Sequence, residues 1–82
     1  MIQIEVIAPG KLVFKGEAIS VKLPGDAGEF GVLKNHAPLI STLGKGNLSI
    51  TDVQNKIHNF GIEGGVVEVL NNKISVLAEK TY

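Results

Sequence analysis

Apolar and polar residues alternate along most of this chain. Near the start, the apolar even positions of Ile2–Val6 alternate with Gln3 and Glu5 until Pro9-Gly10 interrupts the pattern. The same period of two returns at residues 19–23, 48–51, 67–69 and 74–76. A period of two that is bounded by turn residues is typical of a strand with one buried and one solvent-facing side.

Turn-forming residues separate these segments. Leu70 and Lys73 flank Asn71-Asn72, and asparagine tolerates the positive φ that a type I′ hairpin turn requires at both central positions. A tight hairpin is therefore predicted there. Further turns are predicted at Lys15-Gly16, Pro24–Gly28, Gly44–Asn47 and Asp52–Asn55.

The spacing of the turns favours an all-β fold. They divide the chain into about eight to ten short strands, which is the spacing of a sandwich or closed sheet, and no window shows a helical stripe. The run from Ile57 to Ile62 breaks the alternation, and this break predicts a β-bulge. No linker, repeat or low-complexity tract is visible, so residues 1–82 are expected to form one domain.

Composition sets the kind of core. The chain is 44% hydrophobic but has only three phenylalanines, one tyrosine and no tryptophan, so isoleucine, valine and leucine must supply the core. Eight basic and eight acidic residues cancel, so no net field would attract nucleic acid. The absence of cysteine excludes disulfides and thiolate zinc sites. No signal peptide or membrane anchor is expected, because no apolar stretch approaches about 18 residues.

Glycine-rich segments suggest a phosphate site only superficially. Gly25, Gly28 and Gly31 have the spacing of neither a dinucleotide fingerprint nor a P-loop, and no helix is predicted after them. Gly44-Lys45-Gly46 lacks the following serine or threonine that would bind magnesium. Neither a nucleotide site nor any other cofactor is expected.

The polar residues make no convincing catalytic or metal site. Asp26, His36 and Ser41 are the residue types of a hydrolytic triad, but Ser41 lies in the strand-like LISTL without a nucleophile elbow. His58 is the only other histidine, and two histidines without a third ligand make a poor metal site. A structural role is therefore predicted for His58, and a solvated loop position for Glu29.

Several longer strings carry a resemblance to a known family. The strings IEVIAPGKLVFKGEAISVKLPG, PGDAGEFGVLKNHAPLISTL, GGVVEV and ISVLAE resemble the N-terminal β-sandwich domain of the ε subunit of F-type ATP synthases, nearly end to end. The resemblance implies a flattened ten-stranded sandwich of two antiparallel sheets. It also implies a non-catalytic central-stalk subunit that links the γ subunit to the c-ring, so that proton-driven rotation is coupled to ATP synthesis.

The resemblance assigns two contact segments. Gly28, Glu29, Phe30 and Gly31 match the loop that faces the c-ring in the family, whereas His36, Ala37, Pro38 and Leu39 match the segment that lies toward γ.

The match departs from the family pattern just before His36. The family commonly has proline and glycine there, and this chain has Lys34-Asn35, so Asn35 is predicted to adopt the left-handed conformation of the glycine.

The resemblance also raises expectations about regulation and location. Most family members continue after VLAE into a helical hairpin that can inhibit ATP hydrolysis, and this sequence stops at Tyr82, so inhibition by helix insertion is not expected of it. The protein is expected on the F1 side of a membrane, most simply the cytoplasmic face of a bacterial inner membrane, and attached only through its complex.

Two other readings remain open from the residues. A lipoyl or biotinyl carrier is also a small β-sandwich, and Lys73 beside the predicted hairpin could carry its cofactor, although the usual Asp-Lys or Met-Lys-Met flank is missing. An oligonucleotide-binding fold would need basic residues interleaved with exposed aromatic ones. The neutral charge and the few aromatic residues argue against it.

Overall fold

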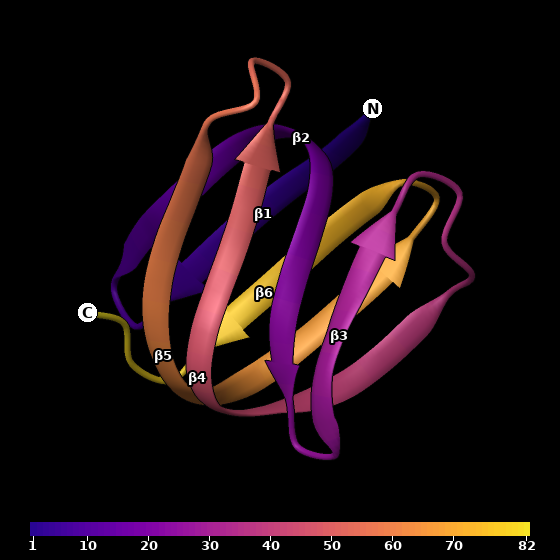
Figure 1. Ribbon diagram of the computed structural model, residues 1–82. Coiled ribbons are helices and arrows are strands. Elements are labelled where there is room, and N and C mark those ends of the chain that lie inside the picture. The colour runs from indigo at the N-terminus through magenta and orange to yellow at the C-terminus, as the bar shows by residue number, and fades with distance from the viewer.

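The computed structural model describes residues 1–82 and consists of β-strands joined by turns. The strands are β1 (Ile2–Ala8), β2 (Lys11–Gly25), β3 (Gly28–Leu33), β4 (Leu39–Asp52), β5 (Ile57–Leu70) and β6 (Lys73–Ala78). They pair in the order β1-β6-β5-β4-β2-β3, and β1 also pairs with β2, which closes the sheet into a flattened, sandwich-like shell (Figure 1). No helix is present that could cross a lipid bilayer.

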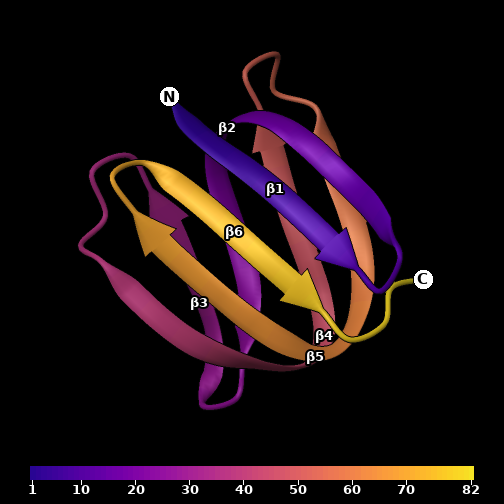
Figure 2. The ribbon, with the colours of Figure 1, turned by 180° about the vertical axis from the view of Figure 1, so that it is seen from behind.

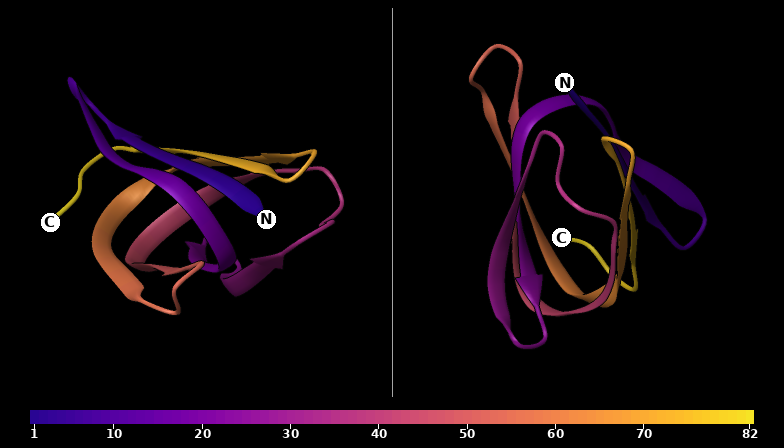
Figure 3. Two further views of the ribbon diagram at one scale, coloured as in Figure 1. Left: turned by 90° about the horizontal axis from the view of Figure 1, so that it is seen from above. Right: turned by 90° about the vertical axis from the view of Figure 1, so that its right-hand side faces the viewer.

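Three strands are too long to run straight through the molecule. β4 and β5 have 14 residues each, and β2 has 15. At about 3.3 Å per residue, 14 residues would span about 46 Å, whereas the largest extent of the whole molecule is 26 Å. Each strand therefore bends and contributes to both layers, as β4 and β5 do in Figures 1 and 2. Figure 3 shows β1 and β6 on one side of the molecule and β3 on the other.

The all-β class predicted from the sequence is confirmed, but the strand count and directions need correction. The chain forms six strands rather than ten, because the layers are joined by bends inside continuous strands. β1 and β6 also run parallel, with Ile4 opposite Ile74, so the sheet is not purely antiparallel. The predicted turns at Lys15-Gly16 and Gly44–Asn47 are wrong, because these residues lie within β2 and β4.

Glycines mark the corner at which β4 and β5 bend together. The ladder pairs Leu43 with Gly65 and Lys45 with Glu63, but it leaves Gly44 and Gly64 unpaired between them. Gly65 has a φ of 143°, and a Cβ atom there would collide with the carbonyl oxygen of Leu77 on β6. The glycine therefore allows β5 to turn the corner while its backbone stays against β6.

Three of the predicted turns are confirmed. Asn71 and Asn72 have φ values of 50° and 60°, as a type I′ turn requires. The β2–β3 hairpin turns within Pro24–Gly28, and the β4–β5 hairpin turns within Asp52–Asn55. The predicted bulge at Ile57–Ile62 is wrong, because the pairing of β5 with β4 is uninterrupted there.

The core is entirely aliphatic. Sixteen buried residues, all isoleucine, valine, leucine or alanine, form one cluster between the layers. The inward positions predicted by alternation are buried with one exception, Ile19, which is exposed. The pairing of β2 with β4 shifts between Ala18 and Ser20, so Ala18 takes the inward position instead.

One carboxylate organises the turn between β4 and β5. Oδ1 of Asp52 accepts hydrogen bonds from the backbone N–H groups of Gln54 at 2.8 Å and Lys56 at 3.0 Å. Nε2 of His58 donates to Oδ2 of Asp52 at 2.9 Å, and the His58 ring lies 5.0 Å from that of Phe14. This arrangement confirms the structural role predicted for His58. The hydrogen bond from His58, together with those from the backbone, holds the pKa of Asp52 below its ordinary value.

The lowered pKa of Asp52 predicts a pH-dependent contribution to stability. A carboxyl group whose pKa is lower in the folded protein stabilises it above the unfolded pKa of about 3.9, and this contribution is lost as the pH falls through the folded value. We expect Asp52→Asn to lower the free energy of unfolding at pH 7, and the difference from wild type to shrink at pH 3. Urea unfolding at both pH values measures this. Asp26→Asn is the control, and an Asp52→Asn deficit that is equal at both pH values would contradict the assignment.

The close packing at the corner predicts that substitution of Gly65 strongly lowers the stability of the protein. Gly65→Ala places a side chain at positive φ against the backbone of β6, so we expect a loss of about 3 kcal/mol or more in unfolding free energy. Gly31→Ala is the matched control, because the nearest atom to its new Cβ is the Val21 carbonyl oxygen at 3.8 Å. Equal stability of the two variants in thermal or urea unfolding would show that the corner tolerates a side chain.

Candidate functional site

The two predicted contact segments lie at opposite ends of β3. Gly28–Gly31 forms the start of β3 rather than a loop, directly after the β2–β3 turn at the bottom of Figure 1. The second segment, His36–Leu39, lies in the loop between β3 and β4, at the upper right, and ends on the first residue of β4. Glu29 lies near the start of β3, and His36 lies three residues beyond its end at Leu33. The structure therefore presents two separate surfaces instead of a single site.

The β2–β3 hairpin presents Glu29 to solvent. Glu29 lies opposite Pro24, is exposed, and forms no ion pair within the molecule. Phe30 is turned the other way, half-buried against the core, and a Cβ atom on Gly25 would lie 2.9 Å from its ring. Of the four residues predicted in this segment, Glu29 presents an exposed charge and Phe30 packs the hairpin against the core.

The loop between β3 and β4 presents His36, Ala37 and Pro38. The His36 backbone N–H donates to the Leu33 carbonyl at 3.2 Å, and Nδ1 of its ring donates to the Ala37 carbonyl at 2.7 Å. Leu39 begins β4 and packs against the core. The left-handed conformation predicted for Asn35 is confirmed by its φ of 65°.

An exposed apolar surface continues from this loop and was not predicted from the sequence. Ile40, Val66 and Leu77 are 72%, 41% and 56% exposed, and we call them the apolar patch. Val66 pairs with Leu77, and all three residues line a shallow hollow on the outer face of β4, β5 and β6. Contiguous exposed apolar groups of this kind mark contact surfaces.

A sequence signal for the apolar patch does exist. Each member belongs to an apolar doublet within a strand: Leu39-Ile40, Val66-Val67 and Val76-Leu77. Successive side chains of a strand point to opposite faces, so one member of each doublet must face outward. If the alternation of apolar and polar residues is used only to locate buried positions, the outward-facing member of each doublet is overlooked.

The residues of the hypothetical triad are not brought together. Asp26 lies at the β2–β3 turn and His36 at the other end of β3, and the Ser41 hydroxyl donates to the neighbouring Thr42 carbonyl at 3.2 Å. No three acidic or histidine side chains are arranged to bind a metal ion. Lys45 lies within strand β4 and pairs with Glu63 at 3.9 Å, so its segment does not form a phosphate loop.

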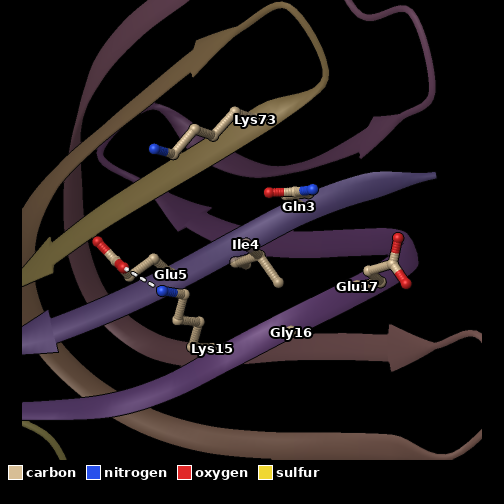
Figure 4. A pocket seen from close by; sticks show the side chains of 7 residues that line it. All are labelled: Gln3, Ile4, Glu5, Lys15, Gly16, Glu17 and Lys73. Atoms are coloured by element: carbon tan, nitrogen blue, oxygen red, sulfur yellow. Dashed lines mark ion pairs between the residues drawn. The ribbon is translucent and has the colours of Figure 1, made fainter.

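A polar hollow of about 310 Å³ lies on the outer face of β6, β1 and β2 (Figure 4). Two lysines and two glutamates line it and balance in charge, and Nζ of Lys15 lies 4.0 Å from Oε2 of Glu5. Lys73 opens β6, one residue beyond the Asn71-Asn72 tip, and its side chain runs along the strand. A carrier lysine must project to reach distant active sites, so this position does not favour the carrier reading.

Comparison with known sequences places the chain in a family. Residues 1–82 match the family described as "ATP synthase, Delta/Epsilon chain, beta-sandwich domain". The ATP synthase epsilon chain of Leptospira borgpetersenii serovar Hardjo-bovis is 45% identical over 78 residues, covering 95% of this chain and 61% of that protein. The epsilon chain of Desulfatibacillum aliphaticivorans is 44% identical over 78 residues, covering 95% of this chain and 55% of that protein. This chain thus spans little more than half the length of these relatives.

Solved structures show the same fold at low identity. A chain of the Euglena gracilis mitochondrial ATP synthase, in a structure of OSCP, F1 and c-ring, has a TM-score of 0.92 at 20% identity, covering 99% of this chain and 52% of that chain. A chain of the Tetrahymena thermophila enzyme, in a structure of its central stalk and c-ring, has a TM-score of 0.79 at 18% identity, covering 99% of this chain and 65% of that chain. With the match along all 82 residues, these findings show that the chain belongs to the β-sandwich domain family of the ATP synthase delta and epsilon chains.

Proposed function

We propose that this domain is part of a non-catalytic rotor subunit of an F-type ATP synthase, which links the γ subunit to the c-ring and so couples proton-driven rotation to ATP synthesis. The observation that carries the proposal is the family match over residues 1–82, and the relatives named ATP synthase epsilon chain agree with it. In this role the domain is attached to the membrane through the complex, on the F1 side.

The γ-binding surface consists of the His36–Leu39 loop and the apolar patch. Ile40 follows Leu39 directly, so the loop and the patch are continuous. A stable protein interface has an apolar centre with a polar rim, and here exposed aliphatic side chains lie beside Glu68 and Ser75. The patch adds three exposed aliphatic side chains to the loop, and in this proposal it is the main source of affinity.

The c-ring contact is made by the β2–β3 hairpin through Glu29. The hairpin lies at the far end of β3 from His36, so both partners can bind without overlapping. The unpaired Glu29 carboxylate is free to meet polar groups of the ring. A densely packed sandwich between the two contacts has low compressibility and can pass on torque.

The role of the apolar patch predicts that Ile40→Ser weakens binding to γ without unfolding the domain. Ile40 is 72% exposed in the isolated chain, so stability should change by less than about 0.5 kcal/mol. The affinity for purified γ from the same source, measured by calorimetry, should fall about tenfold, or about 1.4 kcal/mol. Ile57→Ser is the matched control, because Ile57 is 62% exposed at the start of β5, away from the patch. Equal loss in both variants, or none in Ile40→Ser, would refute the patch as the γ surface.

The role of Glu29 predicts a defect in coupling. Glu29→Ala changes an exposed side chain, so folding should be unaffected within about 0.5 kcal/mol. ATP-driven proton pumping in membrane vesicles that contain the whole complex should decrease relative to ATP turnover. Glu17→Ala, an exposed glutamate on β2, is the control. Unchanged pumping by the Glu29 variant would count against a ring contact at this position.

A further inference from the structure

Asn72 connects three segments that are distant in sequence. Its backbone carbonyl accepts a hydrogen bond from the N–H of Gln3 at 2.9 Å. Its side-chain Oδ1 accepts from the backbone N–H of Asn35 at 2.6 Å, and its Nδ2 donates to Oδ1 of Asn35 at 3.2 Å. The β5–β6 hairpin is thereby tied to the start of β1 and to the loop between β3 and β4.

The two asparagines match each other in conformation as well as in hydrogen bonding. Asn35 and Asn72 have φ values of 65° and 60°, so both occupy the left-handed region. Each uses its backbone to make a turn and its side chain to reach the other turn, 37 residues away. Glycine would adopt the same φ at lower cost but could not make the side-chain bonds.

The loop has no other hydrogen bond that ties it to a remote segment. The bonds of His36 are local, one to the Leu33 carbonyl and one to the Ala37 carbonyl. His36, Ala37 and Pro38 have no fully buried side chain among them. The pair formed with Asn72 is therefore the contact that fixes the start of this loop relative to the β5–β6 hairpin.

We propose that Asn72 is a positioning residue for the γ-binding loop: through its reciprocal pair with Asn35 it holds residues 34–38 in one conformation before binding. This inference rests on the proposed function, because it takes His36–Leu39 as part of the γ surface. A loop that is already ordered loses less conformational entropy on association, so the pair raises affinity without touching the partner.

The chain supplies a matched control for Asn72. Asn71 is the same residue type in the same turn, with a φ of 50°, and its side chain makes no hydrogen bond to another part of the molecule. Asn71→Gly and Asn72→Gly both preserve the positive φ of the type I′ turn. Only Asn72→Gly removes the link to Asn35, and because both variants keep the turn, both should remain folded in water.

Amide hydrogen exchange tests the link in the isolated chain. Asn72→Gly should speed exchange of the Asn35 amide by about fivefold or more, the factor expected for one lost hydrogen bond. Asn71→Gly should leave that rate within about twofold of wild type, because it removes no bond to the loop. Asn72→Asp keeps an oxygen that accepts from the Asn35 N–H and should retain most of the protection. The proposal is overturned if the two glycine variants exchange alike, or if the aspartate variant exchanges as fast as Asn72→Gly.

Binding to purified γ tests what the link is for. The affinity of Asn72→Gly should fall about threefold to tenfold, as expected for the cost of ordering a few residues, with Asn71→Gly unchanged. If wild type binds and Asn72→Gly binds equally well, the positioning role is wrong. If wild type does not bind γ, the proposed function fails and the positioning role with it, whereas the exchange rates still report whether the link orders the loop.

Discussion

The fold depends on the shared corner at which β4 and β5 bend. Because Gly44 and Gly64 face each other there and Gly65 lets the backbone pass close to β6, the two 14-residue strands β4 and β5 cross between the layers together. The aliphatic core then lies between the two halves of the same strands. Layers that are joined in this way cannot slide apart without breaking strand pairing, so a small core is enough to hold them.

This construction explains how one small domain can hold apart the two surfaces that we propose as contacts. β3 pairs only with β2, and its two ends carry the Glu29 hairpin and the His36 loop. Ile40 and Val66 of the apolar patch lie on the bent strands β4 and β5, and Leu77 lies beside them on β6. The spacing of the patch from the hairpin is therefore set by the continuous backbone of β4 and its pairing with β2. The connector role proposed above requires a fixed separation of this kind.

Much of this fold could be predicted from the sequence, and the exceptions have physical reasons. The alternation of apolar and polar residues predicted the buried positions, and the pair Asn71-Asn72 predicted the turn between β5 and β6. Both signals are local in the sequence. The turn predicted at Gly44–Asn47 is instead a bend within β4, because local composition does not distinguish a chain reversal from a bend within a strand. Ile19 faces outward because of a register shift that only the pairing partner reveals. The apolar patch depends on which strands are neighbours, and the Asn35–Asn72 pair joins residues that only the fold brings together.

The loops are ordered by polar contacts at the surface rather than by burial. No polar side chain is buried, and every residue with positive φ that is not glycine is asparagine: Asn35, Asn55, Asn71 and Asn72. Asparagine makes the same turns as glycine with fewer unfolded conformations and adds a side chain that can hydrogen-bond. In the β4–β5 turn, the Asp52 carboxylate likewise orders the backbone by accepting hydrogen bonds from the N–H groups of Gln54 and Lys56. The interior therefore sets the shape of the shell, whereas a few short polar side chains set the shape of the loops at its surface.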